Sequence, residues 1–218
     1  MNSSLSTCDR ILDSAERLFA EEGFHVSSMR QITQAADVNL AAINYHFGSK
    51  QALVVAVFRR RLDSLNRARL QRLDTALDDP GEPRLQAVLD AFVRPAIELT
   101  HDQAGKGHRF MRILLRAFAD QDEQLRRDLS AEYAHVMRRF ADAIEQALPG
   151  TSRDTIRRQL DFIVGALTHT MAESHSEDGP AIATDLVAFA AAGLRGTHTL
   201  NSNPSSTAGA NRTMEIVR

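Results

Sequence analysis

The sequence predicts an all-α fold of about nine helices, and three observations support this. Apolar residues recur with the helical period nearly everywhere in the 218 residues, and no window shows the sustained alternation typical of a strand. Serine, asparagine, glycine and proline, which start and stop helices, fall between the periodic segments. With 43% hydrophobic and 25% charged residues, the chain has an ordinary globular composition.

The composition also limits the compartment. Cys8 is the single cysteine, which excludes an intramolecular disulfide and fits a reducing environment. The N-terminal residues lack the apolar core of a signal peptide, and no run of about 18 apolar residues could span a membrane. We therefore expect a cytoplasmic protein without a membrane partner.

The first helix is predicted to end before Gly23, a residue suited to a left-handed C-cap. Ser28 and Gln31 have the spacing of a capping box and predict the start of a short second helix. A turn at Asp37 follows, and Asn39 can cap a third helix through its side chain. One face of the first helix is apolar and consists of Ile11, Leu12, Ala15, Leu18 and Phe19.

Longer helices follow. Gly48 and Ser49 separate the third helix from a fourth over about 50–78, and the breaker at 80–83 ends that helix. Further helices are predicted at about 84–100, 108–119, 122–147, 153–175 and 181–195. From Thr197 onward the polar chain has too little apolar surface to offset the entropy of ordering, so we expect a disordered tail.

The third helix carries the most informative pattern. Leu40, Ile43 and Phe47 form a stripe that we expect to face the protein, whereas Ala41, Ala42 and Tyr45 point away. Two alanines in a short helix usually indicate plain packing. The order of capped second helix, tight turn and short third helix instead favours a helix–turn–helix, whose second helix enters the DNA major groove.

Small side chains permit close approach to the bases, and alanine methyl groups can touch the thymine methyl group. Backbone amides at the starts of the second and fourth helices, together with Ser28 and Lys50, are placed to hold phosphates. The whole chain carries a net charge of −2, but residues 28–61 hold five basic residues against Asp37 alone. These five are Arg30, Lys50, Arg59, Arg60 and Arg61.

Residues 9–58 resemble the N-terminal domain of TetR-type transcriptional regulators. The resemblance rests on "AERLFAEEGF", "SSMRQITQAADV" and "INYHFGSKQAL". Two positions depart from the family pattern: Asp37 replaces a usual glycine, and Asn44 replaces a phosphate-binding tyrosine whose contact Tyr45 or His46 could take over. The resemblance implies a DNA-binding set of Ser28, Arg30, Asn39, Leu40, Ala41, Ala42, Asn44, Tyr45, His46 and Lys50.

The resemblance further implies a DNA-binding domain at 5–65, with the helix–turn–helix at 28–47, a ligand-binding and dimerisation domain at 66–200, and a disordered tail at 201–218. It implies a homodimer through the last two helices that binds a double-stranded DNA operator and loses DNA affinity when a small molecule binds. Small residues there would permit close helix approach, and simple intramolecular packing would equally explain them. They are Gly165, Ala166, Ala188, Ala191 and Ala192.

The stretches "FMRILLRAF", "LRRDLSAEYAHVMRRF" and "FIVGALTHTMAE" are similar to PsrA-like regulators, which implies a long-chain fatty acid or acyl-CoA as effector. Arg112 and Arg116 could anchor a carboxylate, or could lie on a solvated face. The candidate ligand-binding residues could also be plain core. They are Phe92, Phe110, Met111, Leu114, Phe118, Tyr133, Met137, Phe140, Phe162, Ala166 and His169.

Enzyme motifs such as G-x-S-x-G, H-E-x-x-H and the P-loop are absent from the sequence. His169, Glu173 and His175 could be written as metal ligands but lack a fourth, so we predict no metal, no cofactor and no enzymatic activity. Two functional classes remain. One is a repressor that responds to a lipid effector, or a repressor of an efflux or catabolic operon that responds to a non-lipid effector. The other is a TetR-fold binding module without DNA function.

Overall fold

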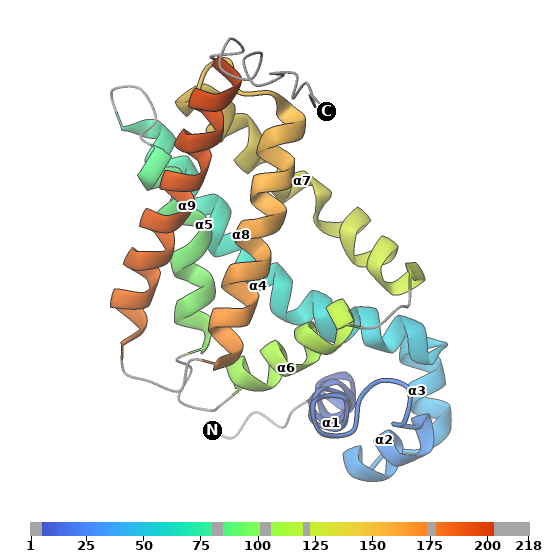
Figure 1. Ribbon diagram of the computed structural model, residues 1–218. Coiled ribbons are helices and arrows are strands. Elements are labelled where there is room, and N and C mark those ends of the chain that lie inside the picture. Colours follow the sequence, from blue (N-terminus) through green and yellow to red (C-terminus); the bar gives the residue numbers. More distant parts are fainter. Residues whose placement is uncertain (1–5, 80–84, 101–105, 120–122, 174–177, 203–218) are drawn as a thin grey trace, which may run out of the picture.

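The computed structural model describes residues 6–79, 85–100, 106–119, 123–173 and 178–202. All regular structure in these ranges is helical, and the nine helices there match the prediction (Figure 1). A small head consists of α1 (Thr7–Glu21), α2 (Met29–Ala36) and α3 (Leu40–Phe47). The larger body consists of α4 (Lys50–Asp78), α5 (Leu85–Thr100), α6 (Lys106–Ala119), α7 (Glu123–Ala147), α8 (Arg153–Glu173) and α9 (Gly179–Ser202).

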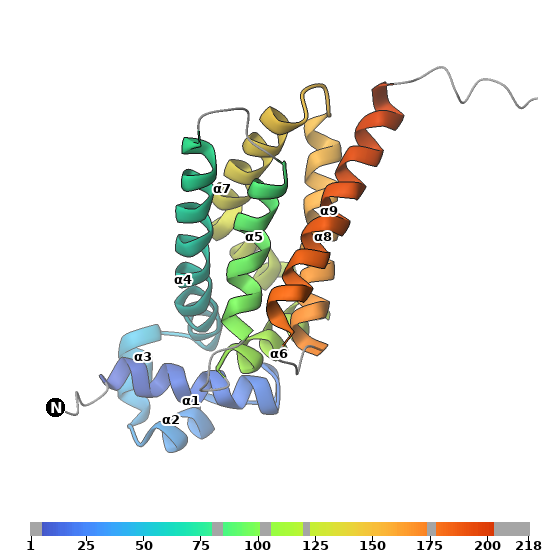
Figure 2. The same cartoon turned by 90° about the vertical axis from the view of Figure 1, so that its left-hand side faces the viewer.

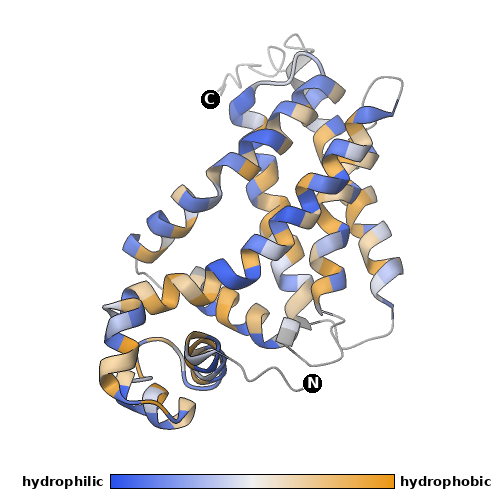
Figure 3. Ribbon diagram, turned by 180° about the vertical axis from the view of Figure 1, so that it is seen from behind, coloured by the Kyte–Doolittle hydropathy of each residue, from blue (hydrophilic) through white to orange (hydrophobic). Residues whose placement is uncertain are grey.

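Helix α4 joins the head to the body. It packs on α1 and α3 near its start and on α5 and α7 farther along (Figure 2). Its first turns are mostly hydrophobic, and hydrophilic residues dominate its outer side beyond them (Figure 3). The predicted domain boundary between residues 65 and 66 falls inside this continuous helix. The two predicted units therefore share one rigid element, and their buried residues form one connected core.

The caps of the head follow from local chemistry. The Ser28 hydroxyl accepts from the Gln31 amide at 3.2 Å, and the Ser28 amide donates to Gln31 Oε1 at 2.7 Å, which completes the predicted capping box. Asp37 has a left-handed φ of 51°. Aspartate tolerates this conformation better than most residues, so the turn forms without glycine. Arg10 Nε donates to the Ala36 carbonyl at 3.0 Å and satisfies one carbonyl at the end of α2.

The next two helices are capped as predicted. Asn39 Oδ1 accepts from the Ala42 amide at 2.7 Å at the start of α3. Ser49 Oγ accepts from the Ala52 amide at 3.1 Å at the start of α4. These two caps set the turns on either side of α3 and therefore fix the direction in which that short helix presents its side chains.

A chain of aromatic rings connects the head to the body. Phe19 of α1 contacts Phe24, with ring centroids 5.6 Å apart, and Phe24 contacts Phe58 of α4 at 6.0 Å. Phe58 in turn contacts Phe110 of α6 at 6.0 Å. All four rings are buried, so a displacement of α6 must be accommodated by the packing of the head.

Helix α9 is longer than predicted. It continues to Ser202, so the expectation that disorder begins at Thr197 is wrong for residues 197–202. The Thr197 hydroxyl donates to the Gly193 carbonyl at 3.1 Å, and His198 Nδ1 lies 2.8 Å from the Thr151 hydroxyl beside α8. This tertiary contact supports a segment whose composition alone argues for disorder. Residues 203–218, most of the predicted tail, lie outside the described residues.

None of the helices in the described ranges is long and apolar enough to cross a membrane.

Candidate functional site

The outer face of α3 is open to solvent. Tyr45 is 87% exposed, and Ala41, Asn44 and His46 are also exposed, whereas Ile43 is completely buried. The predicted stripes need two corrections. Leu40 is exposed rather than inward-facing, because it is the first residue of α3 and projects beyond the core. Ala42 is half-buried rather than fully outward.

The N-terminal starts of α2 and α4 carry the other predicted DNA-binding residues. Ser28 and Arg30 are exposed at the start of α2. Lys50 is the first residue of α4, and its Nζ donates to the His25 carbonyl at 3.2 Å. Burial lowers the pKa of Lys50. Lys50 begins α4, whose first backbone amides have no acceptor within the helix, so a phosphate oxygen could bind at this helix start.

The basic cluster at 59–61 does not belong to this face. Arg59 pairs with Glu132 of α7 at 2.9 Å, and Arg61 pairs with Glu16 of α1 at 2.8 Å. Arg60 also pairs with acidic residues of α1. Of the five positive charges counted in the sequence, Arg60 and Arg61 therefore join α4 to the head and Arg59 joins α4 to α7. Arg30 and Lys50 are the two of the five that remain for a nucleic acid.

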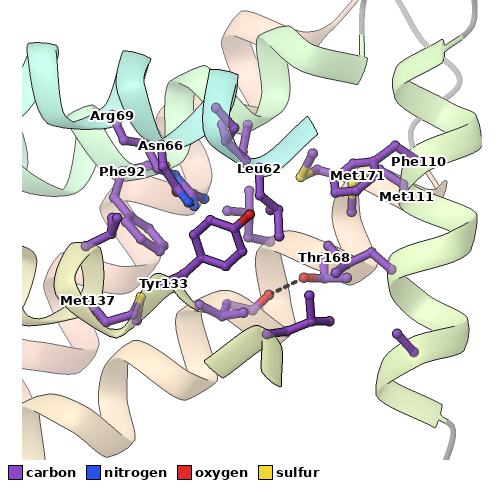
Figure 4. A pocket seen from close by; sticks show the side chains of 18 of the residues that line it. Leu62, Asn66, Arg69, Phe92, Phe110, Met111, Tyr133, Met137, Thr168 and Met171 are labelled. Carbon is purple, nitrogen blue, oxygen red and sulfur yellow. Dashed lines mark hydrogen bonds between the residues drawn. The ribbon is translucent and has the colours of Figure 1, made fainter. Parts of the chain in front are cut away.

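The body encloses a pocket of ≈ 230 Å³ (Figure 4). Its walls come from five helices, α4 to α8. Apolar side chains dominate the lining, and the exceptions are Asn66 and Arg69 of α4, Ser130 and Tyr133 of α7, and Thr168 of α8. The remaining lining residues are Leu62, Leu65, Phe92, Ala96, Phe110, Met111, Leu114, Ala117, Leu129, Val136, Met137, Val164, Leu167 and Met171.

Arg69 is a buried cation in this lining, with 9% of its surface exposed. Its Nε donates to the Phe92 carbonyl at 2.9 Å, its Nη1 lies 3.4 Å from Asn66 Oδ1, and its guanidinium carbon lies 4.0 Å from the Phe92 ring centroid. Burial lowers the pKa of Arg69 to about 9, so the side chain remains charged at pH 7.

Tyr133 links the pocket to α4. Its hydroxyl donates to Asp63 Oδ1 at 3.4 Å. Burial and the nearby Asp63 carboxylate both raise the pKa of Tyr133, so the phenol is neutral and available as a donor. The ring faces the pocket while the hydroxyl contacts a residue only one turn beyond Arg59 and Arg60. A molecule in the pocket can therefore act on the same helix that carries the head.

Comparison with known families agrees with this division into head and body. Residues 11–57 match the model for "Bacterial regulatory proteins, tetR family", and residues 90–193 match "Tetracyclin repressor-like, C-terminal domain". The chain belongs to the TetR family. This membership confirms the predicted fold, and it identifies a transcriptional regulator rather than an enzyme.

Relatives in the TetR family share part of the sequence. The transcriptional activator FasR of Mycolicibacterium smegmatis is 34% identical over 83 residues, which are 38% of this chain and 37% of FasR. The regulator UidR of Escherichia coli is 31% identical over 102 residues, which are 46% of each chain. The chain thus matches less than half the length of these two relatives.

A solved structure of the fatty acid degradation regulator FadR from Bacillus halodurans superposes with a TM-score of 0.60 at 15% identity, covering 97% of this chain and 100% of FadR. At this identity the likeness concerns the TetR fold alone.

Six of the eleven predicted ligand-binding residues line the TetR-type pocket. They are Phe92, Phe110, Met111, Leu114, Tyr133 and Met137. Phe140 is buried behind the wall, with its ring 4.9 Å from that of Phe92. The helical backbone at Phe118 is described, but its side chain lies outside the described part.

Three predicted lining residues of α8 lie elsewhere. Phe162 is 65% exposed, His169 is exposed, and Ala166 packs against the core without reaching the pocket. The pocket instead uses Val164, Thr168 and Met171 of that helix. The prediction was wrong because α8 has apolar residues on two faces, and periodicity does not say which face turns inward.

Both arginines considered as anchors also lie outside the pocket. Arg112 is exposed, and Arg116 Nη2 donates to the Glu21 carbonyl at 3.3 Å, where α6 meets the end of α1. No cluster of three potential metal ligands occurs among the described residues; His169 is exposed, and the side chains of Glu173 and His175 are outside that part.

The contribution of α4 to the pocket was missed. Its four lining residues sit within the charged stretch "RRRLDSLNRARLQR", which reads as a solvated connection. A signal was present, because Leu62, Leu65, Asn66 and Arg69 recur at helical spacing and place a polar pair on an apolar stripe.

Proposed function

We propose that this TetR-family protein is a transcriptional repressor that binds a pseudo-palindromic operator as a homodimer and is released by a small hydrophobic effector. One observation carries the proposal: α4 bears the head at its start and forms a wall of the pocket one to two turns beyond the junction. A ligand that prefers a different position of α4 shifts the population away from the DNA-binding state.

Two further contacts support coupling between pocket and head. Phe110 lines the pocket and its ring contacts that of Phe58, which in turn contacts Phe24 next to the head helices. Arg116 of α6 reaches the Glu21 carbonyl at the end of α1. Expansion of the pocket on ligand binding would press on both α4 and α6 and thereby change the position of α3.

The outer surface of α8 and α9 supports the proposed dimer. The two helices run antiparallel, since Thr151 meets His198 and a β-carbon at Gly193 would lie 3.5 Å from Gln159 Oε1 (Figure 1). Phe162 lies one turn after Gln159 on α8, and Phe189 lies one turn before Gly193 on α9. Their side chains are 65% and 67% exposed. Large apolar side chains exposed on the same pair of helices support an interface there. A twofold dimer would place two copies of α3 about 34–36 Å apart, one turn of DNA.

For the effector we propose a fatty acid or acyl-CoA, as the resemblance to PsrA-like regulators implies. The pocket supports this with a mainly hydrocarbon lining and a few polar groups. Its ≈ 230 Å³ is below the roughly 300–1,000 Å³ of pockets for drug-sized ligands. A long chain therefore requires the pocket to enlarge, and the flexible side chains of Met111, Met137 and Met171 can permit that.

Chain length provides a test. Each buried CH₂ group contributes ~0.8 kcal/mol, about fourfold in affinity, so affinity should rise along a series of straight-chain acids until the cavity is filled. Leu114→Trp, which fills the cavity, should blunt the response in a gel shift but leave DNA binding intact. Arg112→Trp, at an exposed position of the same helix outside the pocket, is the matched control. Absence of any chain-length dependence would defeat the lipid proposal and favour a regulator of an efflux or catabolic operon.

The DNA-reading face provides a second test. Lys50→Ala should weaken binding to operator and unrelated DNA alike, and reduce the slope of log affinity against log salt by about one per lost phosphate contact. Tyr45→Ala should weaken binding and reduce sequence preference. Arg153→Ala, at the start of α8 and far from the head, should change neither. Wild-type operator affinity in both head variants would favour a TetR-fold binding module without DNA function.

A further inference from the structure

Arg69 differs from its neighbours on α4. Arg59, Arg61 and Arg72 each lie within 2.9 Å of a carboxylate, on Glu132, Glu16 and Glu98 respectively. Arg69 is the more deeply buried side chain, and its contacts are to a backbone carbonyl, an amide oxygen and an aromatic ring. Among the described residues it forms no ion pair.

A buried charge without a counter-charge is costly, and proteins normally pair it or neutralise it. The ring of Phe92 offsets part of that cost by a cation–π contact. Of the five N–H groups of the guanidinium, Phe92 and Asn66 accept two, which leaves three without an acceptor among the described residues. The Asn66 amide nitrogen remains a donor as well, since its oxygen already accepts from Arg69.

These donors occupy one side of the pocket. In Figure 4, Arg69, Asn66 and Phe92 lie together at one side, and Phe110, Met111 and Met171 lie at the other. Tyr133 and Leu62 lie between the two groups. A molecule that satisfies both ends carries an acceptor anion at one end and a hydrocarbon body at the other.

We propose that Arg69 and Asn66 form an anion-binding subsite for a free carboxylate at one end of an otherwise apolar effector. This inference rests on the proposed effector function of the pocket and deepens it. A carboxylate matches the guanidinium in a bidentate, charge-assisted geometry. The thioester of an acyl-CoA carries no charge at the carbonyl, and its phosphates would have to remain in solvent, so the subsite favours the free acid over the thioester.

The cavity volume sets the length of a probe that fits without rearrangement. A volume of ≈ 230 Å³ corresponds to roughly eight water-sized positions at about 30 Å³ each. Octanoate is of this size. Octanol and octylamine have the same chain with a neutral and a cationic end, and octanoyl-CoA has the same chain as a thioester.

The experiment measures direct binding of these four probes by titration calorimetry, without DNA. The wild type should bind octanoate at least tenfold more tightly than octanol, and octylamine and octanoyl-CoA more weakly than octanoate. Arg69→Met should lose this preference for octanoate over octanol, while Arg69→Lys keeps part of it because lysine supplies the charge without the planar fork. Arg72→Met, one turn along α4 at the Glu98 ion pair, should behave as the wild type.

Equal affinity of the wild type for octanoate and octanol, or absence of octanoate binding, would overturn the subsite, even if Arg69→Met failed to fold. An unchanged preference in a folded Arg69→Met variant would overturn it as well. A separate gel shift keeps the two proposals distinguishable. Charge-selective binding that leaves operator affinity unchanged supports the subsite and contradicts the repressor mechanism. DNA release by octanol as readily as by octanoate supports the repressor mechanism and contradicts the subsite.

Discussion

Glu16→Gln is expected to destabilise the protein by ~3–5 kcal/mol, the cost of removing one partner from a buried ion pair. Glu16 is 2% exposed, and its carboxylate accepts from Arg61 Nε at 3.1 Å, from Arg61 Nη2 at 2.8 Å and from Arg60. The glutamine keeps the shape but leaves Arg61 without a carboxylate and Arg60 with Asp13 alone, and both guanidinium groups are largely shielded from solvent. Because this cluster fastens α1 to α4, operator affinity should fall together with stability.

Chemical unfolding followed by circular dichroism measures the effect. Asp13→Asn is the matched control, because Asp13 accepts from Arg60 at 2.7 Å but is partly solvated, and the expected loss is below ~1 kcal/mol. Adding Arg61→Met to Glu16→Gln should recover part of the stability, since it removes the charge that lost its carboxylate partner. A Glu16→Gln protein within 1 kcal/mol of the wild type would show that the cluster contributes little.

Replacing both Phe162 and Phe189 with glutamate is expected to convert the dimer to a monomer and abolish operator binding at physiological salt. A central aromatic residue in an interface typically contributes ~2 kcal/mol or more, and each substitution occurs twice in a symmetric dimer. The dissociation constant of the dimer should therefore rise by a factor of at least ~1,000. Because each half-site is then bound independently, the gain in affinity from joining two heads is lost.

Sedimentation velocity across a concentration series gives the oligomeric state. Val26→Glu provides the control, since Val26 is an equally exposed apolar residue in the connection between α1 and α2. It should leave sedimentation unchanged. A double variant that still sediments as a dimer would place the interface on another surface of the molecule.

The sequence by itself determined the local structure and the family. Capping, turn geometry and helical period depend on residues within about four positions of each other, so Ser28 with Gln31, Asp37 and Asn39 could be assigned correctly. The same locality explains why helix α4 was predicted at 50–78 and found there. The outward direction of Tyr45 followed from the same period.

The tertiary structure decided which charges meet and which faces are covered. Arg59 finds its partner 73 residues away, and Arg60 finds Glu16 at a separation of 44 residues, so a count of basic residues along the chain overstated the charge open to DNA. Residue type alone also fails to predict burial: Phe162 is exposed to solvent, whereas Arg69 is buried. Periodicity defines the faces of a helix, but only the packing of α4 to α8 around a common cavity determines which of those faces is enclosed.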